Sequence, residues 1–306
     1  MLEAVGNTPI VELQRIRAGR GARIMVKLES ANPTGSMKDR IALAMVSRAA
    51  AEGRLVPGGR VVEYTGGSTG MALAFVCAAG GYRCTLVSSD AFSEEKRTGM
   101  AALGAEVLLV PSDRKRITAE LIKEMIEAAR RLSSEPGTYW TDQLNNRDGE
   151  AGYHPLGEEI WKQTEGRVVA FVQSVGTAHS LHGTADVLRK HRPDVRIVAV
   201  EPSESPILSE GRTGGHRIEG IGIGFVPPLW RPEQVDEIVQ VSSDEAMAMA
   251  RRLASEEGLL AGTSTGANVV AALHVAETMP ESGTVTTLAV DSGSKYLSTE
   301  LYSPRS

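Results

Sequence analysis

A lysine stands where a loop gives way to a helix. Residues 32–35 read Asn-Pro-Thr-Gly, which interrupts regular structure, and an Ala-rich apolar helix is expected from Ile41 onward with Ser36 as its candidate N-cap. Lys38 then lies in the first helical turn, where the positive end of the helix and apolar walls disfavour its ammonium form. A neutral lysine can form an imine with a carbonyl compound. The alternative is a surface lysine paired with a neighbouring carboxylate.

A glycine-rich turn joins a strand-like run to a helix-like run at residues 65–70, which read Thr-Gly-Gly-Ser-Thr-Gly. In open α/β sheets, ligands bind beyond the carboxyl ends of the strands. Glycines let the backbone approach a ligand, and the hydroxyls of Thr65, Ser68 and Thr69 can hydrogen-bond an anion. A carboxylate or phosphate fits this turn, and an ordinary turn with Ser68 as N-cap is the alternative.

A second such turn follows the apolar run Val-Val-Ala-Phe-Val. Backbone N–H groups of Gly176 to His179, with the hydroxyls of Thr177 and Ser180, are arranged to cradle a phosphate at a helix N-terminus. The turn lacks the Gly-Lys-Ser/Thr of a nucleoside-triphosphate loop. The pair His179 and His182 is more typical of packing or solvent exposure than of a metal site.

A third hydroxyl-rich turn, at residues 262–267, can place a neutral hydroxyl against a heterocyclic nitrogen. Together, an imine-forming lysine, a phosphate cradle and hydroxyl-rich turns fit pyridoxal phosphate better than a nucleotide. Serine hydrolase chemistry is less favoured because the chain has no Gly-x-Ser-x-Gly elbow.

The composition is that of an ordinary globular protein. The 306 residues are 42% hydrophobic and 23% charged, and the formal net charge of -5 argues against nucleic acid as a partner. No apolar run is long enough to span a membrane, and we see no signal peptide, so a cytoplasmic protein is expected. Cys77 and Cys84 lack Cys-x-x-Cys spacing and are expected to be buried reduced thiols.

Strand-like and helix-like segments alternate along the chain, which predicts an α/β fold with open, mostly parallel sheets covered by helices. The glycine- and proline-rich stretch 202–240 is expected to be loop without a dinucleotide fingerprint. The predicted strands are 23–29, 60–65, 83–88, 106–110, 168–174, 196–201 and 285–291. The predicted helices are 36–52, 68–79, 93–103, 118–134, 155–164, 178–191, 243–257 and 265–278.

Several segments, in order, resemble one enzyme family. They run almost the whole length of the chain: Val5-Gly6-Asn7-Thr8-Pro9, Lys27-Leu28-Glu29, residues 32–40 and residues 291–299. This set resembles the cysteine synthase (O-acetylserine sulfhydrylase) and cystathionine β-synthase family of fold-type II pyridoxal-phosphate enzymes, whose fold is like that of tryptophan synthase β. The resemblance implies a large cofactor-binding domain (1–37 and 146–306) and a small mobile domain (38–145) that closes on the substrate.

The resemblance also implies roles for individual residues. Lys38 carries the cofactor as an internal aldimine and moves the substrate's α-proton. The cofactor phosphate and pyridine nitrogen are held by Gly176, Thr177, the N–H of Ala178, Ser180 and Ser264. The substrate carboxylate is held by Thr65, Gly66, Ser68, Thr69 and Gln143.

Two departures from the family pattern stand out. The family's substrate turn normally reads Thr-Ser-Gly-Asn-Thr-Gly, and here Gly66 and Ser68 replace its Ser and Asn. Because that Asn bonds the cofactor's 3'-oxygen, Ser68 takes a cofactor-binding position as well. The family's phosphate turn usually reads Gly-Thr-Gly-Gly-Thr, whereas this chain has Ala178 and His179, which should either narrow the mouth of the site by their bulk or bring an imidazole towards it.

The resemblance favours β-replacement on an activated L-serine through an aminoacrylate, with O-acetylserine and sulfide as the expected pair and L-cysteine or a related β-substituted alanine as product. The alternatives are cystathionine or diaminopropionate formation, dehydration, racemisation, or the use of O-phosphoserine, for which Arg217 is a candidate contact unless it is structural. Another class is a cofactor-binding protein of low activity that docks serine acetyltransferase. The family implies a homodimer.

Overall fold

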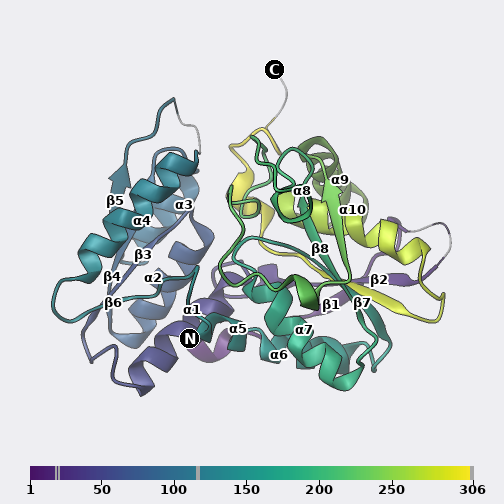
Figure 1. The fold of residues 1–306 in the computed structure, drawn as a ribbon, viewed down its shortest axis with the longest axis horizontal. Helices are drawn as coiled ribbons and strands as arrows, with labels where there is room; N and C mark the ends of the chain where they lie inside the picture. Colours follow the sequence, from purple (N-terminus) through teal and green to yellow (C-terminus); the bar gives the residue numbers. More distant parts are fainter. Residues whose placement is uncertain (18, 20, 115–117, 304–306) are drawn as a thin grey trace. The chain divides into compact units, whose positions relative to one another are not determined.

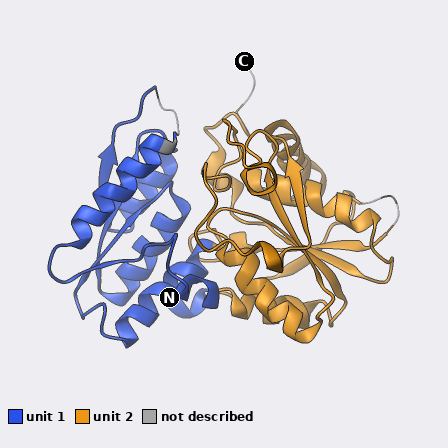
Figure 2. Cartoon of the chain, viewed as in Figure 1, with its two compact units in different colours: residues 1–5, 38–152 blue, residues 6–37, 153–306 orange. Residues whose placement is uncertain are grey.

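The computed structural model describes residues 1–17, 19, 21–114 and 118–303. The chain divides into two compact units, shown in blue and orange in Figure 2. Unit 1 consists of residues 1–5 and 38–152, and unit 2 consists of residues 6–37 and 153–306. Each unit has a sheet and a hydrophobic core of its own.

Unit 1 is built on a four-stranded parallel sheet in the order β5-β4-β3-β6. Helix α4 packs against all four strands, and α2 packs against β3 and β4. The strands are β3 (Arg60–Tyr64), β4 (Arg83–Ser89), β5 (Glu106–Val110) and β6 (Thr138–Trp140). The helices are α1 (Lys38–Ala51), α2 (Ser68–Gly80), α3 (Glu94–Ala102), α4 (Ala119–Ser133) and α5 (Asp148–Ala151).

Unit 2 is built on a six-stranded sheet in the order β1-β2-β10-β7-β8-β9, parallel except for the antiparallel pair β1 and β2. Figure 1 shows α9 and α10 on one side of this sheet and α6 and α7 on the other. The strands are β1 (Ile10–Glu12), β2 (Arg23–Lys27), β7 (Val168–Ser174), β8 (Arg196–Pro202), β9 (Glu237–Val241) and β10 (Thr284–Leu288). The helices are α6 (His154–Gln163), α7 (His179–His191), α8 (Ile207–Glu210), α9 (Ser243–Glu257) and α10 (Thr263–Glu277).

The central strands β7 and β8 are buried along almost their whole length. Strands covered by helices on both faces read as continuous apolar runs, which is why these two segments are recognisable in the sequence. Strand β7 ends at Gln173 and Ser174, and β8 ends at Glu201 and Pro202. Two of the turns that were predicted to bind ligands follow the carboxyl ends of parallel strands, β3 and β7, whereas the third lies between α9 and α10.

The structure differs from the sequence prediction at several elements. The stretch 202–240, expected to be loop, ends in strand β9, which pairs with β8, and it also contains α8. The short elements β1, β6 and α5 were not predicted. Helix α1 begins at Lys38, and Ser36 forms an antiparallel bridge with Asp291, so Ser36 is not the N-cap. Within the described part of the chain, no helix is long and apolar enough to cross a membrane.

Candidate functional site

In unit 1, Thr65 organises the turn between β3 and α2. Its hydroxyl oxygen accepts hydrogen bonds from the N–H groups of Gly67 and Gly70, at 2.9 and 3.0 Å. Ser68 is the first residue of α2 and Gly67 holds the N-cap position, so the capping alternative for Ser68 is wrong. Because Thr65 accepts both of these bonds, its own hydroxyl proton can be donated to a ligand.

Two further predicted residues meet beside this turn. The Thr69 hydroxyl donates to Oε1 of Gln143 at 2.8 Å, and Nε2 of Gln143 donates to the carbonyl oxygen of Tyr64 at 2.9 Å. Both side chains are buried. The structure thus brings Thr69 and Gln143 together, although they lie 74 positions apart in the sequence. The amide of Gln143 keeps one N–H that is not used in the bond to Tyr64.

Both glycine positions inside the turn leave little room for a side chain. Gly67 has a φ of 137°, and a Cβ there would lie 2.4 Å from the Lys96 side chain, which is buried. A Cβ on Gly66 would lie 2.9 Å from the ring of Phe92. A serine at position 66 would therefore need the Phe92 ring to move, which agrees with the glycine found there in place of the family's serine.

Lys38 opens α1 and is covalently joined to a firmly held residue of unit 2, Met37. The N–H of Met37 donates to the carbonyl oxygen of Val290 at 2.9 Å, and its carbonyl oxygen accepts from the hydroxyl of Tyr153 at 3.1 Å. Met37 and Tyr153 are buried. Lys38, which is half-buried, therefore follows a residue whose N–H and C=O are both held by hydrogen bonds.

In unit 2, the turn between β7 and α7 carries the predicted phosphate residues. Gly176 lies so close to the backbone of Gly220 that a Cβ at position 176 would be 2.4 Å from the Gly220 carbonyl oxygen. Ala178, the N-cap residue of α7, has a left-handed φ of 71° and offers no side-chain cap. The first N–H groups of a helix have no intrahelical acceptor, so they suit an anion here. The buried hydroxyl of Ser174 also has no hydrogen-bond partner among the described residues.

A buried amide network ties this turn to α10. Asn268 of α10 accepts from the N–H of Ser174 at 2.8 Å and donates to Oε1 of Gln173 at 2.9 Å. Gln173 in turn donates to the hydroxyl oxygen of Ser180 at 3.1 Å, which leaves the Ser180 proton for a ligand. Ser264 is buried in the first turn of the same helix. Gln173 and Asn268 were not predicted from the sequence as site residues. The only signal for them in the sequence is that each is an amide inside an apolar run.

The two histidines of α7 differ in their surroundings. Both ring nitrogens of His182 are engaged, by Oε1 of Gln234 at 2.6 Å and by the N–H of Arg231 at 3.1 Å, and burial lowers its pKa to about 4. His182 is thus a neutral structural residue. His179 is fully buried, and its Nδ1 lies 2.8 Å from the hydroxyl of Thr177. Its imidazole therefore contacts a predicted phosphate residue.

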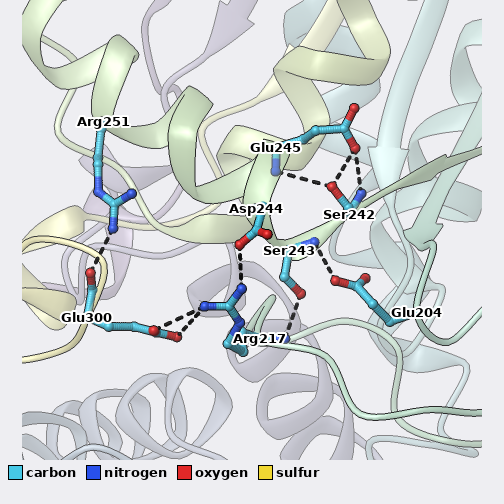
Figure 3. A network of polar contacts seen from close by, with 8 residues as sticks. All are labelled: Glu204, Arg217, Ser242, Ser243, Asp244, Glu245, Arg251 and Glu300. Carbon is cyan, nitrogen blue, oxygen red and sulfur yellow. Dashed lines mark hydrogen bonds and ion pairs between the residues drawn. The ribbon is translucent and has the colours of Figure 1, made fainter.

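Arg217 has the structural role that the sequence left open. Its guanidinium pairs with Asp244 at 2.5 Å and with Glu300 at 3.1 Å (Figure 3). The backbone N–H of Arg217 donates to the hydroxyl oxygen of Ser243. The Asp244 side chain holds the pKa of Arg217 above its ordinary value. Two carboxylates already neutralise this cation, so it does not support an anionic donor such as O-phosphoserine. Arg251 completes the cluster by donating to the carbonyl oxygen of Glu300 at 2.8 Å.

The residues of each unit suit a different part of pyridoxal phosphate chemistry. The uncapped end of α7, the unpartnered Ser174 hydroxyl and the glycine-lined turn fit a phosphate group. Within the described part of the chain, no group of three or more His, Cys, Asp or Glu residues could hold a metal ion. The helix end, the Ser174 hydroxyl and the glycine-lined turn thus fit the phosphate of the predicted cofactor.

Comparison with known proteins identifies the family. Residues 1–291 match the model of the pyridoxal-phosphate dependent enzymes. A cysteine synthase of Staphylococcus aureus (strain Mu50 / ATCC 700699) is 42% identical over 303 residues, which cover 98% of this chain and 96% of the relative. The crystal structure of cysteine synthase (OASS) from Entamoeba histolytica has a TM-score of 0.91 and 37% identity, covering 100% of this chain and 90% of that one. An O-ureido-L-serine synthase has a TM-score of 0.91 and 38% identity, covering 98% and 94%.

The chain therefore belongs to the family of pyridoxal-phosphate-dependent enzymes. Within this family it is a cysteine synthase-like enzyme of β-replacement, with the fold-type II architecture. The predicted fold class, cofactor and reaction class are thus confirmed.

Proposed function

We propose that this enzyme replaces the acetoxy group of O-acetyl-L-serine with sulfide and forms L-cysteine. The observation that carries this proposal is the combination of an uncapped, glycine-lined helix N-terminus at α7 with a lysine at the first position of α1. The similarity to the S. aureus cysteine synthase supports the choice of product.

The proposal assigns a task to each predicted residue. The N–H groups around Gly176 and Ala178, with the hydroxyls of Thr177 and Ser180, hold the cofactor phosphate, and Ser264 faces the pyridine nitrogen. Pyridoxal phosphate, when bound, stabilises negative charge at the substrate's α-carbon. The Nζ of Lys38 binds the cofactor and takes the α-proton. The substrate carboxylate is bound by Thr65, Gly66, Ser68, Thr69 and Gln143, while Ser68 also approaches the cofactor ring.

We further propose that residues 38–145 act as a small mobile domain and that residues 1–37 with 146–306 act as the large cofactor-binding domain. Closing the small domain on the substrate would exclude water during the reaction. We also propose a homodimer that works in the cytoplasm and can dock serine acetyltransferase. The two buried free cysteines suit a reducing compartment. Size-exclusion chromatography with light scattering and a pull-down with serine acetyltransferase test the assembly.

The visible spectrum tests the main proposal. The wild-type protein with pyridoxal phosphate should show the absorption band of a lysine-bound cofactor, and O-acetyl-L-serine should shift it. Lys38→Ala should lack the band, whereas Lys162→Ala, which changes an exposed lysine on α6, should keep it. Added sulfide should restore the band and yield L-cysteine. A wild-type spectrum that does not change when O-acetyl-L-serine is added contradicts the proposal, and so does a Lys38→Ala protein with the wild-type band.

A second candidate keeps the donor and changes the nucleophile. The ring of Phe92 against Gly66 places apolar surface at the substrate turn, and such a surface suits a nucleophile with a hydrocarbon body. The similarity to an O-acetylserine dependent cystathionine β-synthase from Helicobacter pylori, at 35% identity and a TM-score of 0.91, is consistent with this candidate. A product survey with sulfide, homocysteine and ammonia as nucleophiles distinguishes the formation of cysteine, cystathionine and diaminopropionate. The same survey is repeated with serine and O-phosphoserine as donors.

A further inference from the structure

Glu63 is a fully buried carboxylate whose hydrogen-bond partners are all neutral groups. Its Oε1 accepts from the N–H of Tyr64 at 2.9 Å and from the indole N–H of Trp140 at 3.3 Å. Its Oε2 accepts from the Thr141 hydroxyl at 2.5 Å and from the N–H of Gln143 at 2.9 Å. Four donors converge on one side chain, and an ionised carboxylate can accept all of them.

The position of Glu63 at the end of β3 explains this convergence. Strand β6 pairs with β3 up to Trp140, and the N–H of Thr141 still reaches the carbonyl oxygen of Val62 at 3.2 Å. The chain then turns at Asp142, a non-glycine residue with a φ of 44°, which costs conformational energy. Beyond this turn the backbone N–H of Gln143 donates to the carboxylate of Glu63 instead of to the backbone of β3. Glu63 therefore adds a side-chain acceptor to a turn that the backbone also closes, through the N–H groups of Asn145 and Asn146 and the carbonyl oxygen of Asp142.

The turn that Glu63 stabilises ends at Gln143, which bonds both Tyr64 and Thr69. We propose that Glu63 is a positioning residue for substrate binding: it fixes residues 141–143 so that Gln143 and Thr69 keep the geometry that a substrate carboxylate needs. Glu63 does not itself contact the substrate in this arrangement. The inference rests on the proposed function, which assigns Thr69 and Gln143 to the substrate.

The side-chain chemistry makes substitutions informative. In Glu63→Gln, one acceptor oxygen becomes an NH₂ group that faces donors, so at least one of the four bonds must break. Thr141→Val removes a single donor and keeps the shape of the side chain. Glu106→Gln is a matched control, because Glu106 also accepts from a threonine hydroxyl, that of Thr85 at 2.9 Å, but lies on edge strand β5 away from the substrate turn.

The experiment measures substrate affinity separately from cofactor binding and maximal rate. Holoenzyme is titrated with O-acetyl-L-serine, and the half-saturating concentration of the visible change is recorded with kcat and KM. We expect Glu63→Gln to raise this concentration and KM at least tenfold and Thr141→Val to raise them at least threefold. The cofactor band should persist and kcat should change less than twofold. Glu106→Gln should match the wild type.

Hydrogen exchange of the cofactor-loaded protein without substrate gives a second readout. The Gln143 N–H should exchange faster in Glu63→Gln and Thr141→Val than in the wild type and Glu106→Gln. Wild-type affinity together with wild-type exchange in folded Glu63→Gln or Thr141→Val overturns the inference. If Glu63→Gln does not fold, Thr141→Val decides by the same criteria. If O-acetyl-L-serine does not change the spectrum of the wild type, the proposed donor is wrong. The exchange rates of the Gln143 N–H then decide alone whether Glu63 fixes this turn.

Discussion

Replacing Glu63 with Gln should change how the stability of this protein depends on pH. Burial raises the pKa of the Glu63 carboxyl from 4.5 to about 7, even though its four hydrogen-bond donors oppose this shift. The folded protein therefore holds the Glu63 proton more tightly than the unfolded chain does. The resulting stability is fully present below pH 4.5 and is lost as the pH rises through about 7.

The magnitude follows from the difference between the two pKa values. Each pH unit of difference is worth about 1.4 kcal/mol, so the full loss is roughly 3 kcal/mol. About 2 kcal/mol of it falls between roughly pH 5.5 and 8, a range in which urea unfolding is practical. The free energy of unfolding of the wild type should fall by this amount relative to Glu63→Gln across that range. Glu106→Gln should follow the wild type.

Trp140 provides a local probe of the same titration. Its indole N–H donates to Glu63, so its emission should respond to the charge of that carboxyl. In a Trp161→Phe/Trp230→Phe background, the emission of Trp140 should show an inflection near pH 7 that disappears on adding Glu63→Gln. Parallel stability profiles of wild type and Glu63→Gln, or an inflection that survives the substitution, would refute the reasoning.

Three further predictions concern the two ligand-binding turns. Gly66→Ser places a Cβ 2.9 Å from the ring of Phe92, so the free energy of unfolding should fall by about 1 to 3 kcal/mol and recover in the Gly66→Ser/Phe92→Ala double variant. Equal losses with and without Phe92 would speak against this contact. Gly176→Ala places a methyl group 2.4 Å from the Gly220 carbonyl oxygen, so the affinity for pyridoxal phosphate, measured by absorbance titration, should fall at least about tenfold. An unchanged affinity would show that the turn can shift to accommodate the methyl group. Ala178 has a left-handed φ of 71°, which strains a residue that carries a Cβ. Ala178→Gly should therefore raise the free energy of unfolding, measured in urea, by about 1 kcal/mol. An unchanged free energy would mean that Ala178 is unstrained.

The sequence predicted the parts of the fold that have strong local signals. Strands β5 and β7 and helix α9 have the predicted bounds, because apolar runs end at polar or glycine-rich turns. The strands β1 and β6, with three residues each, carry too little periodicity to be recognised, and they depend on pairing with β2 and β3. Strand β9 lies at an edge, and its residues are mostly half-buried, so its apolar signal is weak.

The candidate site could be predicted only where it follows from a local motif. Thr65, Gly176 and Ser264 lie in turns that the sequence marks by glycine and hydroxyl residues. The partners of these turns come from distant positions, such as Glu63 and Thr141, which are 78 positions apart. A single sequence contains no signal for such a pairing. The one available hint was a carboxylate inside an otherwise apolar strand, since buried charges are retained only when they are hydrogen-bonded.

Both units use the same device, a buried polar side chain at the end of a central strand, but with different chemistry. In unit 2, Gln173 and Asn268 hold Ser174 and Ser180 through amides, which do not titrate. In unit 1, Glu63 holds Gln143 through a carboxylate whose pKa is about 7. The protonation of Glu63 should therefore affect the affinity for the amino-acid substrate more than the affinity for the cofactor. Parallel titrations of pyridoxal phosphate and O-acetyl-L-serine between roughly pH 6 and 8 can separate the two, and Glu63→Gln should abolish only the difference in substrate affinity.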